Sequence, residues 1–285
     1  MSDPSSVPKR VFPTARRDAA VAEQVSTSPQ TESTAYRLAF QDNDFLLRED
    51  LRPVRFQLEL LKPEILLEEA NIGSTFVFYG SARIPSPDVA QTLVDAATTP
   101  VQRRIAERLA AKAKYYDEAR KLAQFASQCG CDDDKRQFVV CSGGGPSIME
   151  AANRGAADVG APSIGLNIVL PHEQLPNPYV TPGLSLQFHY FALRKMHFLL
   201  RARAVAVFPG GFGTFDESFE LLTLVQTGKV APMPILFFGK EFWNRVVNFD
   251  ALVEEGVISP NDLNTFRFVE TADEAWEIVR AHYGM

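Results

Sequence analysis

Short apolar runs alternate along the chain with longer segments in which apolar residues recur every three or four positions. The short runs are rich in β-branched and aromatic residues and predict buried strands, whereas the longer segments predict helices. The predicted strands lie within residues 74–82, 137–145, 163–171, 184–191, 204–211, 232–239 and 265–270. The predicted helices lie within residues 112–128, 146–160, 192–202, 214–228, 241–256 and 271–283. This alternation predicts an α/β fold with a doubly wound, mainly parallel sheet that carries helices on both faces.

A different pattern precedes the first predicted strand. Residues 1–34 are rich in Ser, Thr, Pro, Ala and charged residues, and such a segment buries too little apolar surface to offset the entropy of ordering. We expect this tail to be disordered, or ordered only by a partner subunit. Residues 35–71 space apolar side chains at helical intervals and predict a helical extension, in which Pro53 and Pro63 mark breaks or first turns. The remainder, 72–285, is predicted to be the main α/β domain.

The composition is that of a globular protein whose partner is a small molecule. Of 285 residues, 46% are hydrophobic and 22% are charged, which is enough apolar content for a substantial core. The net charge of −6 disfavours binding to nucleic acid or to an anionic membrane, and no apolar run is long enough to span a bilayer. Cys129, Cys131 and Cys141 lack the spacing of a zinc site and are expected to be reduced thiols. Because no signal peptide is visible, we expect a cytoplasmic protein.

Three of the predicted strands end in glycine or other small residues. Because the carboxyl ends of parallel strands lie along one edge of a sheet, we expect these three ends to form one binding site. The candidate substrate-binding residues in them are Ser81, Gly143, Gly144, Gly145, Gly210, Gly211, Gly213 and Thr214.

The loop at residues 209–214 has two interpretations. A glycine-rich turn from a strand into a helix lets backbone N–H groups approach a phosphate, and Thr214 adds a hydroxyl. The alternative is a tight turn with close packing of helix on strand, which the glycines alone support equally well. The loop has neither the third glycine of a dinucleotide-binding motif nor the Lys of an ATP-binding loop, so its spacing favours a monophosphate.

The carboxylate of Glu217 also has two interpretations. Thr214 and Glu217 have the spacing of a capping box, in which the Glu side chain returns to the backbone at the start of the helix. The spacing alone favours this cap. A carboxylate beside a phosphate-binding turn can instead face the sugar carbon from which a leaving group departs.

Basic residues lie on the predicted helix that precedes this loop. Arg201 and Arg203, near its end, are expected to be solvated and to favour the helix dipole. Arg194 and Lys195 follow a strand end closely, where an arginine can clamp a phosphate or stabilise a leaving base. The four histidines show no metal-ligand spacing, so we expect no metal site and no cofactor.

Together these residues resemble the Lonely Guy family of phosphoribohydrolases, proteins often mislabelled lysine decarboxylases. The family signature PGGxGTxxE stands intact at Pro209 to Glu217, and the Arg194-Lys195 pair precedes it by a helix. The resemblance covers residues 72–270 and includes the segments FYGSARIP, CSGGGPSIMEAANRGA, LPNPYVTPGLSLQFHYFALRKM, LLTLVQTGK and EEGVISPNDL.

The resemblance implies a Rossmann-like fold and a homodimer or higher homo-oligomer. It also implies hydrolysis of the N-glycosidic bond of a nucleoside 5′-monophosphate, either AMP or a cytokinin riboside 5′-monophosphate, to free base and ribose 5-phosphate without a metal. By position it implies a catalytic pair, a phosphate loop and two further positions that line the substrate site: Arg194 with Glu217; Gly210, Gly211, Gly213 and Thr214; and Lys195 with Thr223.

The chain departs from the short plant-type members of the family. Phe188 to Lys195 replaces their Met-His-x-Arg-Lys motif, as in longer bacterial members, and Glu173 is the nearest equivalent of a carboxylate that they place upstream. Two non-catalytic alternatives are a carrier of a phosphate-bearing ligand, like the molybdenum-cofactor carrier proteins, and a nucleotide sensor. The joint presence of Arg194 and Glu217 favours the enzyme.

Overall fold

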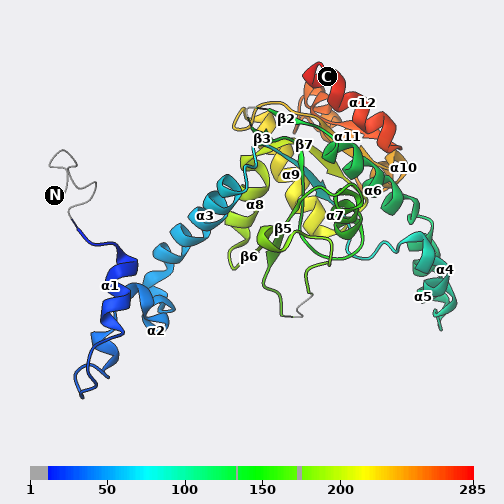
Figure 1. Ribbon diagram of the computed structural model, residues 1–285. Coiled ribbons are helices and arrows are strands. Elements are labelled where there is room, and N and C mark those ends of the chain that lie inside the picture. The colour runs from blue at the N-terminus through cyan, green and yellow to red at the C-terminus, as the bar shows by residue number, and fades with distance from the viewer. Residues whose placement is uncertain (1–11, 133, 172–174) are drawn as a thin grey trace. The chain divides into compact units, whose positions relative to one another are not determined.

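A seven-stranded, fully parallel sheet forms the centre of the protein (Figure 1). The computed structural model describes residues 12–132, 134–171 and 175–285. The sheet order is β6-β5-β4-β1-β7-β8-β9. Its strands are β1 (Thr75–Tyr79), β4 (Val139–Ser142), β5 (Ser163–Ile168), β6 (Ser185–Phe188), β7 (Ala202–Val207), β8 (Ile235–Phe238) and β9 (Arg267–Val269). The predicted α/β fold class is therefore confirmed.

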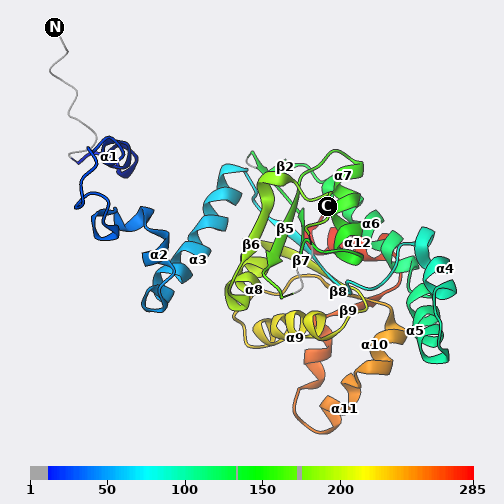
Figure 2. The same cartoon turned by 90° about the horizontal axis from the view of Figure 1, so that it is seen from below.

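Helices cover both faces of this sheet. They are α6 (Lys114–Ser127), α7 (Ile148–Asp158) and α12 (Ala272–Tyr283) on one face, and α8 (Phe191–Leu200), α9 (Phe212–Gln226), α10 (Lys240–Val246), α11 (Phe249–Glu254) and the end of α3 (Arg52–Glu69) on the other (Figure 2). Alternate residues of a strand point to opposite faces, so the fully buried β1 serves both cores. Phe76 and Phe78 join the α6–α7–α12 core, whereas Val77 and Tyr79 join the other.

The order of the strands places a crevice beside β1. The chain runs outward from β1 through β4, β5 and β6, and it then returns to the other edge of β1 with β7. In doubly wound sheets, ligands bind beyond the carboxyl ends of the strands at such a reversal. Strands β4, β1 and β7 are neighbours, so their three glycine-containing ends lie along one edge of the sheet, as predicted.

Several smaller elements complete the chain. They are the hairpin of β2 (Cys131–Asp132) with β3 (Lys135–Arg136), and the helices α1 (Ala15–Ala22), α2 (Asn43–Leu46), α4 (Pro87–Asp95) and α5 (Pro100–Ala110). The chain divides into a unit of residues 1–58 and a unit of residues 59–285. The first eleven residues of the predicted tail lie outside the described residues, and the predicted domain boundaries stay predictions. Helix α1, within the predicted tail, buries none of its residues.

Pro63 does not break the helix of the predicted helical extension, contrary to one of the two roles predicted for it. Helix α3 continues through Pro63, which is buried, and Pro53 lies in its first turn. A proline in a helix leaves the carbonyl four residues earlier without its usual donor. That carbonyl belongs to Glu59, and the Nε2 atom of His197 lies 3.2 Å from it. The lost helical hydrogen bond is thus replaced by a bond from α8, which favours the continuous helix.

Glu59 also caps helix α8 with its side chain. The backbone N–H groups of His189 and Tyr190 donate to the two carboxylate oxygens of Glu59, at 2.7 and 3.1 Å. The first N–H groups of a helix have no partner within the helix, and a carboxylate there also complements the helix dipole. The end of α3 therefore helps to fix α8, the helix that carries Arg194.

A buried polar network supports the loop after β4. The side-chain oxygen of Asn153 accepts from the Ser142 hydroxyl at 2.7 Å and from the Asn177 amide at 2.9 Å, while its own amide donates to the Ile164 carbonyl at 3.3 Å. The Asn177 amide also donates to the carbonyls of Gly144 and Gly145. Because Asn153 is fully buried, each of these bonds replaces one that would otherwise be made to water.

Two further observations concern the classes of site that the composition disfavours. In the described part of the chain, no helix has both the length and the apolar character needed to cross a bilayer. Among the same residues, no three His, Cys, Asp or Glu side chains lie close enough together to hold a metal ion. Cys129 and Cys141 are free thiols. The cytoplasmic location stays a prediction.

Replacement of Asn153 by Ala tests the network. We expect the free energy of unfolding to fall by about 2–4 kcal/mol, because Ser142 and Asn177 lose buried partners. Urea denaturation of Asn153→Ala, beside Asn261→Ala at an exposed position, provides the measurement. Equal stability of the two variants would show that the network contributes little.

Candidate active site

A cavity of about 790 Å³ opens at the carboxyl ends of β1 and β7. Both the volume and the position are typical of small-molecule sites in α/β proteins. It is lined by Gly80, Ser81, Ala82, Arg83, Met149, Arg194, Gly211, Phe212, Gly213, Thr214, Phe215, Glu217 and Val246. The cavity thus brings together six residues predicted from the sequence: Ser81, Arg194, Gly211, Gly213, Thr214 and Glu217.

The glycine loop after β7 leads into a helix without a side-chain cap. Helix α9 begins at Phe212, and its N-cap residue, Gly211, has no side chain to accept from the first turn. The first backbone N–H groups therefore remain available at the cavity, in the positive field of the helix N-terminus. This arrangement suits a phosphate. Gly210 lies just behind, where an added Cβ would come within 2.1 Å of the Thr214 hydroxyl oxygen.

Glu217 does not form the capping box that its spacing favours. Because α9 begins at Phe212, Thr214 is the third residue of the helix and not its cap. Thr214 is buried, and its backbone carbonyl accepts from the Ser218 hydroxyl at 2.6 Å. The Glu217 carboxylate instead faces Arg194, with Oε1 and the nearest guanidinium nitrogen 3.4 Å apart. The prediction of a cap was wrong, and the second interpretation, a carboxylate that faces the ligand site, agrees with the geometry.

Arg194 is held in place from several directions. Its Nε donates to the Leu166 carbonyl on β5 at 2.7 Å, and its guanidinium lies 5.1 Å from the centre of the Phe198 ring. Only 8% of the residue is exposed. A guanidinium with this little water needs fixed partners, and here one is a carbonyl and the other a carboxylate. The planar group is therefore presented to the cavity in one orientation.

Burial changes the ionisation of Glu217. Loss of water raises its pKa to about 7, and Arg194 limits this rise because it favours the carboxylate. Tyr79 and Cys141 lie on the sheet beneath; burial, and in second place the charge of Glu217, keeps the pKa of the Tyr79 hydroxyl well above its ordinary value. Titratable groups with shifted pKa values in a cavity are typical of catalytic sites.

The loop after β4 leaves space for the guanidinium of Arg194 because Gly143 has no side chain. An added Cβ at Gly143 would lie 2.6 Å from a guanidinium nitrogen of Arg194 and 2.8 Å from the sulfur of Met149. Gly144 has a positive φ of 73°, which glycine adopts without strain. Gly144 and Gly145 do not line the cavity; their carbonyls accept from Asn177.

A strained residue joins this loop to the end of β1. Ser147, at the start of α7, has a φ of 67°, an uncommon value for a non-glycine residue. Its hydroxyl donates to the Ile84 carbonyl. Ser81 in turn connects the loops on both sides, since its N–H donates to the Pro209 carbonyl at 3.1 Å and its carbonyl accepts from Ile148 at 3.4 Å. Strain of this kind is often concentrated at functional sites.

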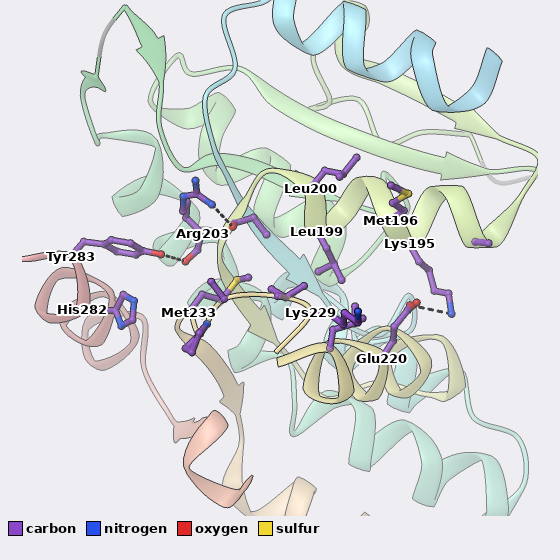
Figure 3. A pocket seen from close by; sticks show the side chains of 16 residues that line it. Lys195, Met196, Leu199, Leu200, Arg203, Glu220, Lys229, Met233, His282 and Tyr283 are labelled. Carbon is purple, nitrogen blue, oxygen red and sulfur yellow. Dashed lines mark hydrogen bonds and ion pairs between the residues drawn. The ribbon is translucent and has the colours of Figure 1, made fainter. Parts of the chain in front are cut away.

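Gly143, Gly144, Gly145 and Gly210 adjoin the cavity without lining it, and the other two predicted site residues lie elsewhere. Lys195 points away from the cavity and pairs with Asp216 and Glu220, each at 3.1 Å. Thr223 is exposed, and its hydroxyl donates to the Phe219 carbonyl in its own helix. Lys195 lines a second cavity on the outer side of α8 and α9 (Figure 3). Their assignment to the substrate site stays a prediction. Glu173, the candidate upstream carboxylate, lies outside the described residues.

The cavity contains residues that the sequence did not single out. Arg83 adds a second cation, and Phe212 lies at the mouth with 96% of its surface exposed. Phe215 and Val246 add apolar surface. Arg83 belongs to the motif FYGSARIP, and Phe212 occupies the variable position of PGGxGT. Their place within these motifs could therefore have identified both as candidate site residues. Val246 comes from α10, and no local pattern marked it.

Comparison with known proteins finds similarity to one family. Residues 149–279 match the family described as "Possible lysine decarboxylase". The probable cytokinin riboside 5′-monophosphate phosphoribohydrolase LOGL3 of Oryza sativa subsp. japonica is 29% identical over 168 residues, 57% of this chain and 74% of that protein. The cytokinin riboside 5′-monophosphate phosphoribohydrolase LOG7 of Arabidopsis thaliana is 28% identical over 151 residues, 52% of this chain and 66% of that protein.

These similarities confirm the predicted resemblance: the chain is similar to the Lonely Guy phosphoribohydrolases. Among solved structures, the molybdenum cofactor carrier protein of Chlamydomonas reinhardtii has a TM-score of 0.44 at 15% identity, over 74% of this chain and 99% of that chain.

The close approach of Gly143 to the guanidinium of Arg194 allows a first test of the site. In Gly143→Ala the new methyl group displaces the guanidinium of Arg194, so we expect weaker ligand binding in a folded protein. Thermal unfolding and equilibrium dialysis with ribose 5-phosphate, which has no N-glycosidic bond, measure the two properties. Gly183→Ala is a matched control, because a Cβ there meets nothing within 4 Å. Wild-type affinity in Gly143→Ala would contradict the proposed packing.

The raised pKa of Glu217 gives a second test. Since folding raises this pKa from 4.5 to about 7, the folded state favours the proton. The resulting stabilisation is complete below pH 4.5 and is lost as the pH rises through 7. Glu217→Gln cannot titrate, so from pH 5 to pH 8 its free energy of unfolding should rise relative to wild type by on the order of 1–3 kcal/mol. Urea denaturation at both pH values measures it; a constant difference would refute the assignment.

Proposed function

We propose that the protein hydrolyses the N-glycosidic bond of a nucleoside 5′-monophosphate to free base and ribose 5-phosphate. The single observation that carries this proposal is the buried Glu217 carboxylate, paired with Arg194, in the same cavity as the uncapped start of α9. The relatives named above, called phosphoribohydrolases of cytokinin riboside 5′-monophosphates, support the same reaction. AMP and N6-substituted AMP are the proposed substrates.

The glycine loop accounts for binding of the phosphate. Gly211, Phe212 and Gly213 line the cavity at the positive end of α9, where backbone N–H groups suit the oxygens of a phosphate. A phosphate fixed there places the attached ribose within the cavity that Glu217 lines. Arg83 supplies a further cation, and the apolar side chains of Phe212 and Val246 offer a surface to the base.

The buried pair accounts for the chemistry. In the proposed reaction the bond between C1′ and the base nitrogen breaks, and the electron pair leaves with the base. Positive charge develops on the ribose, and the oxygen of a water molecule bonds to C1′ and gives up a proton, while the nitrogen of the departing base takes up a proton. Glu217 in its carboxylate form stabilises this charge or takes that proton, and Arg194 stabilises the departing base or the phosphate. A pKa near 7 suits a group that must accept and release a proton at neutral pH.

The experiment measures free base by chromatography after incubation with AMP, N6-substituted AMP and other nucleoside monophosphates. We expect base release, with a loss of about 10²–10⁴ in rate for Glu217→Gln and for Arg194→Gln. Glu277→Gln, on the exposed side of α12, serves as the control with wild-type rate. Tight retention of a nucleotide with no base release, in folded protein, would replace this proposal by a carrier or a sensor.

The pH dependence tests the role of the carboxylate. Because the ionised form of Glu217 acts in both proposed roles, kcat/KM should rise with pH and level off above an apparent pKa near 7. About one molecule in a hundred carries the carboxylate at pH 5, so the fall toward acid should be large. A profile that is flat, or that falls, between pH 5 and pH 8 would exclude these roles for Glu217.

A further inference from the structure

A further cavity, of about 500 Å³, lies between the end of α5, the start of α6 and helix α10. We call it the α5–α10 cavity. Its charged lining residues are Arg108, Lys112, Lys114, Arg245 and Glu241. These four cations and one carboxylate contrast with the chain as a whole, whose net charge is −6. A cavity lined mainly by one sign of charge attracts small ions of the opposite sign.

The two arginines of this cavity have no partner of opposite charge. Arg108 and Arg245 are exposed, and neither forms an ion pair with any carboxylate in the described part of the chain. Glu241 lines the same cavity but is not paired with either of them. Lys114 differs, because it pairs with Glu270 at 3.5 Å. Both guanidinium groups therefore keep their N–H donors available for a ligand.

Lys112 lies close to both arginines. Its Nζ donates to the Arg108 carbonyl at 2.7 Å and lies 5.9 Å from the centre of the Phe242 ring on α10. Loss of water lowers the pKa of its ammonium group, and the charges of Arg108 and Arg245 lower it further. Glu241 opposes this change without reversing it. Like charges at close range repel each other, so an anion placed among these cations would be stabilising.

The lining indicates the class of ligand. A phosphate group carries a charge of about −1.5 to −2 at pH 7 and offers several acceptor oxygens. Guanidinium groups match these oxygens with paired N–H donors, and a lysine adds a point charge. A cavity of about 500 Å³ also has room for an organic part. Tyr115, Phe242 and Val246 offer apolar surface to it.

We propose that the α5–α10 cavity is a second binding site, for a small molecule that carries a phosphate group. Arg108, Arg245 and Lys112 bind the phosphate oxygens, and Phe242 contacts the rest of the molecule. Among the described residues, Val246 is the only one that lines both this cavity and the candidate active site. The two sites are therefore separate, and α10 borders both. The inference does not depend on the proposed reaction.

Labelling with pyridoxal 5′-phosphate tests the site, because its phosphate group can direct its aldehyde to a neighbouring lysine. The lysine amine adds to the aldehyde carbon, water leaves, and borohydride reduces the imine to a stable secondary amine. Pyridoxal, which lacks the phosphate, is the matched reagent. A lowered lysine pKa favours both reagents, so the ratio of their yields reports recognition of the phosphate.

Peptide mass spectrometry measures this ratio at each lysine. We expect it to be about tenfold higher at Lys112 than at Lys62, an exposed lysine of α3. Equal ratios at the two lysines would overturn the proposal.

Variants of the two arginines identify the groups that bind the phosphate. Arg108→Gln and Arg245→Gln should each lower the ratio at Lys112 by about tenfold, because each removes a charged donor. Arg103→Gln, at an exposed position of α5 outside the cavity, should leave it unchanged. Circular dichroism checks that the variants are folded. An unchanged ratio in both cavity variants would refute the assignment.

Protection from labelling distinguishes the possible ligands. We expect ribose 5-phosphate and inorganic phosphate to protect Lys112, and ribose to have no effect. Weaker protection by inorganic phosphate would indicate an organic phosphate as the ligand, whereas equal protection would indicate phosphate itself. Protection by neither phosphate compound would overturn the proposal.

These measurements are independent of turnover. No lysine lines the candidate active site in the part of the chain that the structure describes, so labelling of Lys112 does not report on that site. Base release from AMP without selective labelling of Lys112 would support the proposed function and refute this inference. Selective labelling without base release would do the reverse.

Discussion

The site depends on keeping two opposite charges together in a space that holds little water. Arg194 and Glu217 come from successive helices, and each is almost completely buried. Removal of water from such a pair costs more than the attraction alone returns unless fixed polar groups help. The Leu166 carbonyl is one such group, and the missing side chain at Gly143 leaves the guanidinium its space. The pKa of Glu217 near 7 agrees with this balance, because burial raises it more than Arg194 lowers it.

Other parts of the molecule show the same preference for function over local stability. The start of α9 lacks a side-chain cap, and Ser147 holds a backbone angle that few residues adopt. Each costs stability that the apolar sheet and its two cores offset. Both features border the ligand cavity or its supporting loop, where free N–H groups and a fixed path of the chain are useful. The molecule is least regular where three strand ends meet.

Much of the fold followed from the sequence because burial on both sides gives strands such as β1 an unmistakable apolar run. The glycines at three strand ends identified the edge of the sheet, because the carboxyl ends of parallel strands lie along one edge. Helices α4 and α5 were not predicted, since they bury only Ala106 between them and their patterns are weak. The start of α9 was also predicted wrongly from the sequence. A glutamate three residues after Thr214 has the spacing of a capping box, but with Gly211 as the N-cap residue the same glutamate faces the cavity.

Only part of the site was predictable, because some of its residues belong to continuous motifs and others come from distant helices. Residues within a continuous motif, such as Gly213 and Glu217, could be found from their spacing, whereas Val246 enters the cavity from a distant helix. Lys195 follows Arg194 directly, yet adjacent residues of a helix point about 100° apart, and it faces another surface. The continuity of α3 through Pro63 could not be read from its neighbours, because its replacement donor, His197, is 138 residues from Glu59.

This separation in sequence has a consequence for folding during synthesis on the ribosome. Glu59 emerges early, but the backbone groups that its carboxylate caps, at His189 and Tyr190, are about 130 positions later. Until residues 189–197 have been synthesised, the carboxylate and the backbone carbonyl of Glu59 in α3 can bind only water. Contacts between distant residues close late, because the intervening chain must first be ordered. The helix that presents Arg194 therefore gains its cap from Glu59 only after residues 189 and 190 have been synthesised.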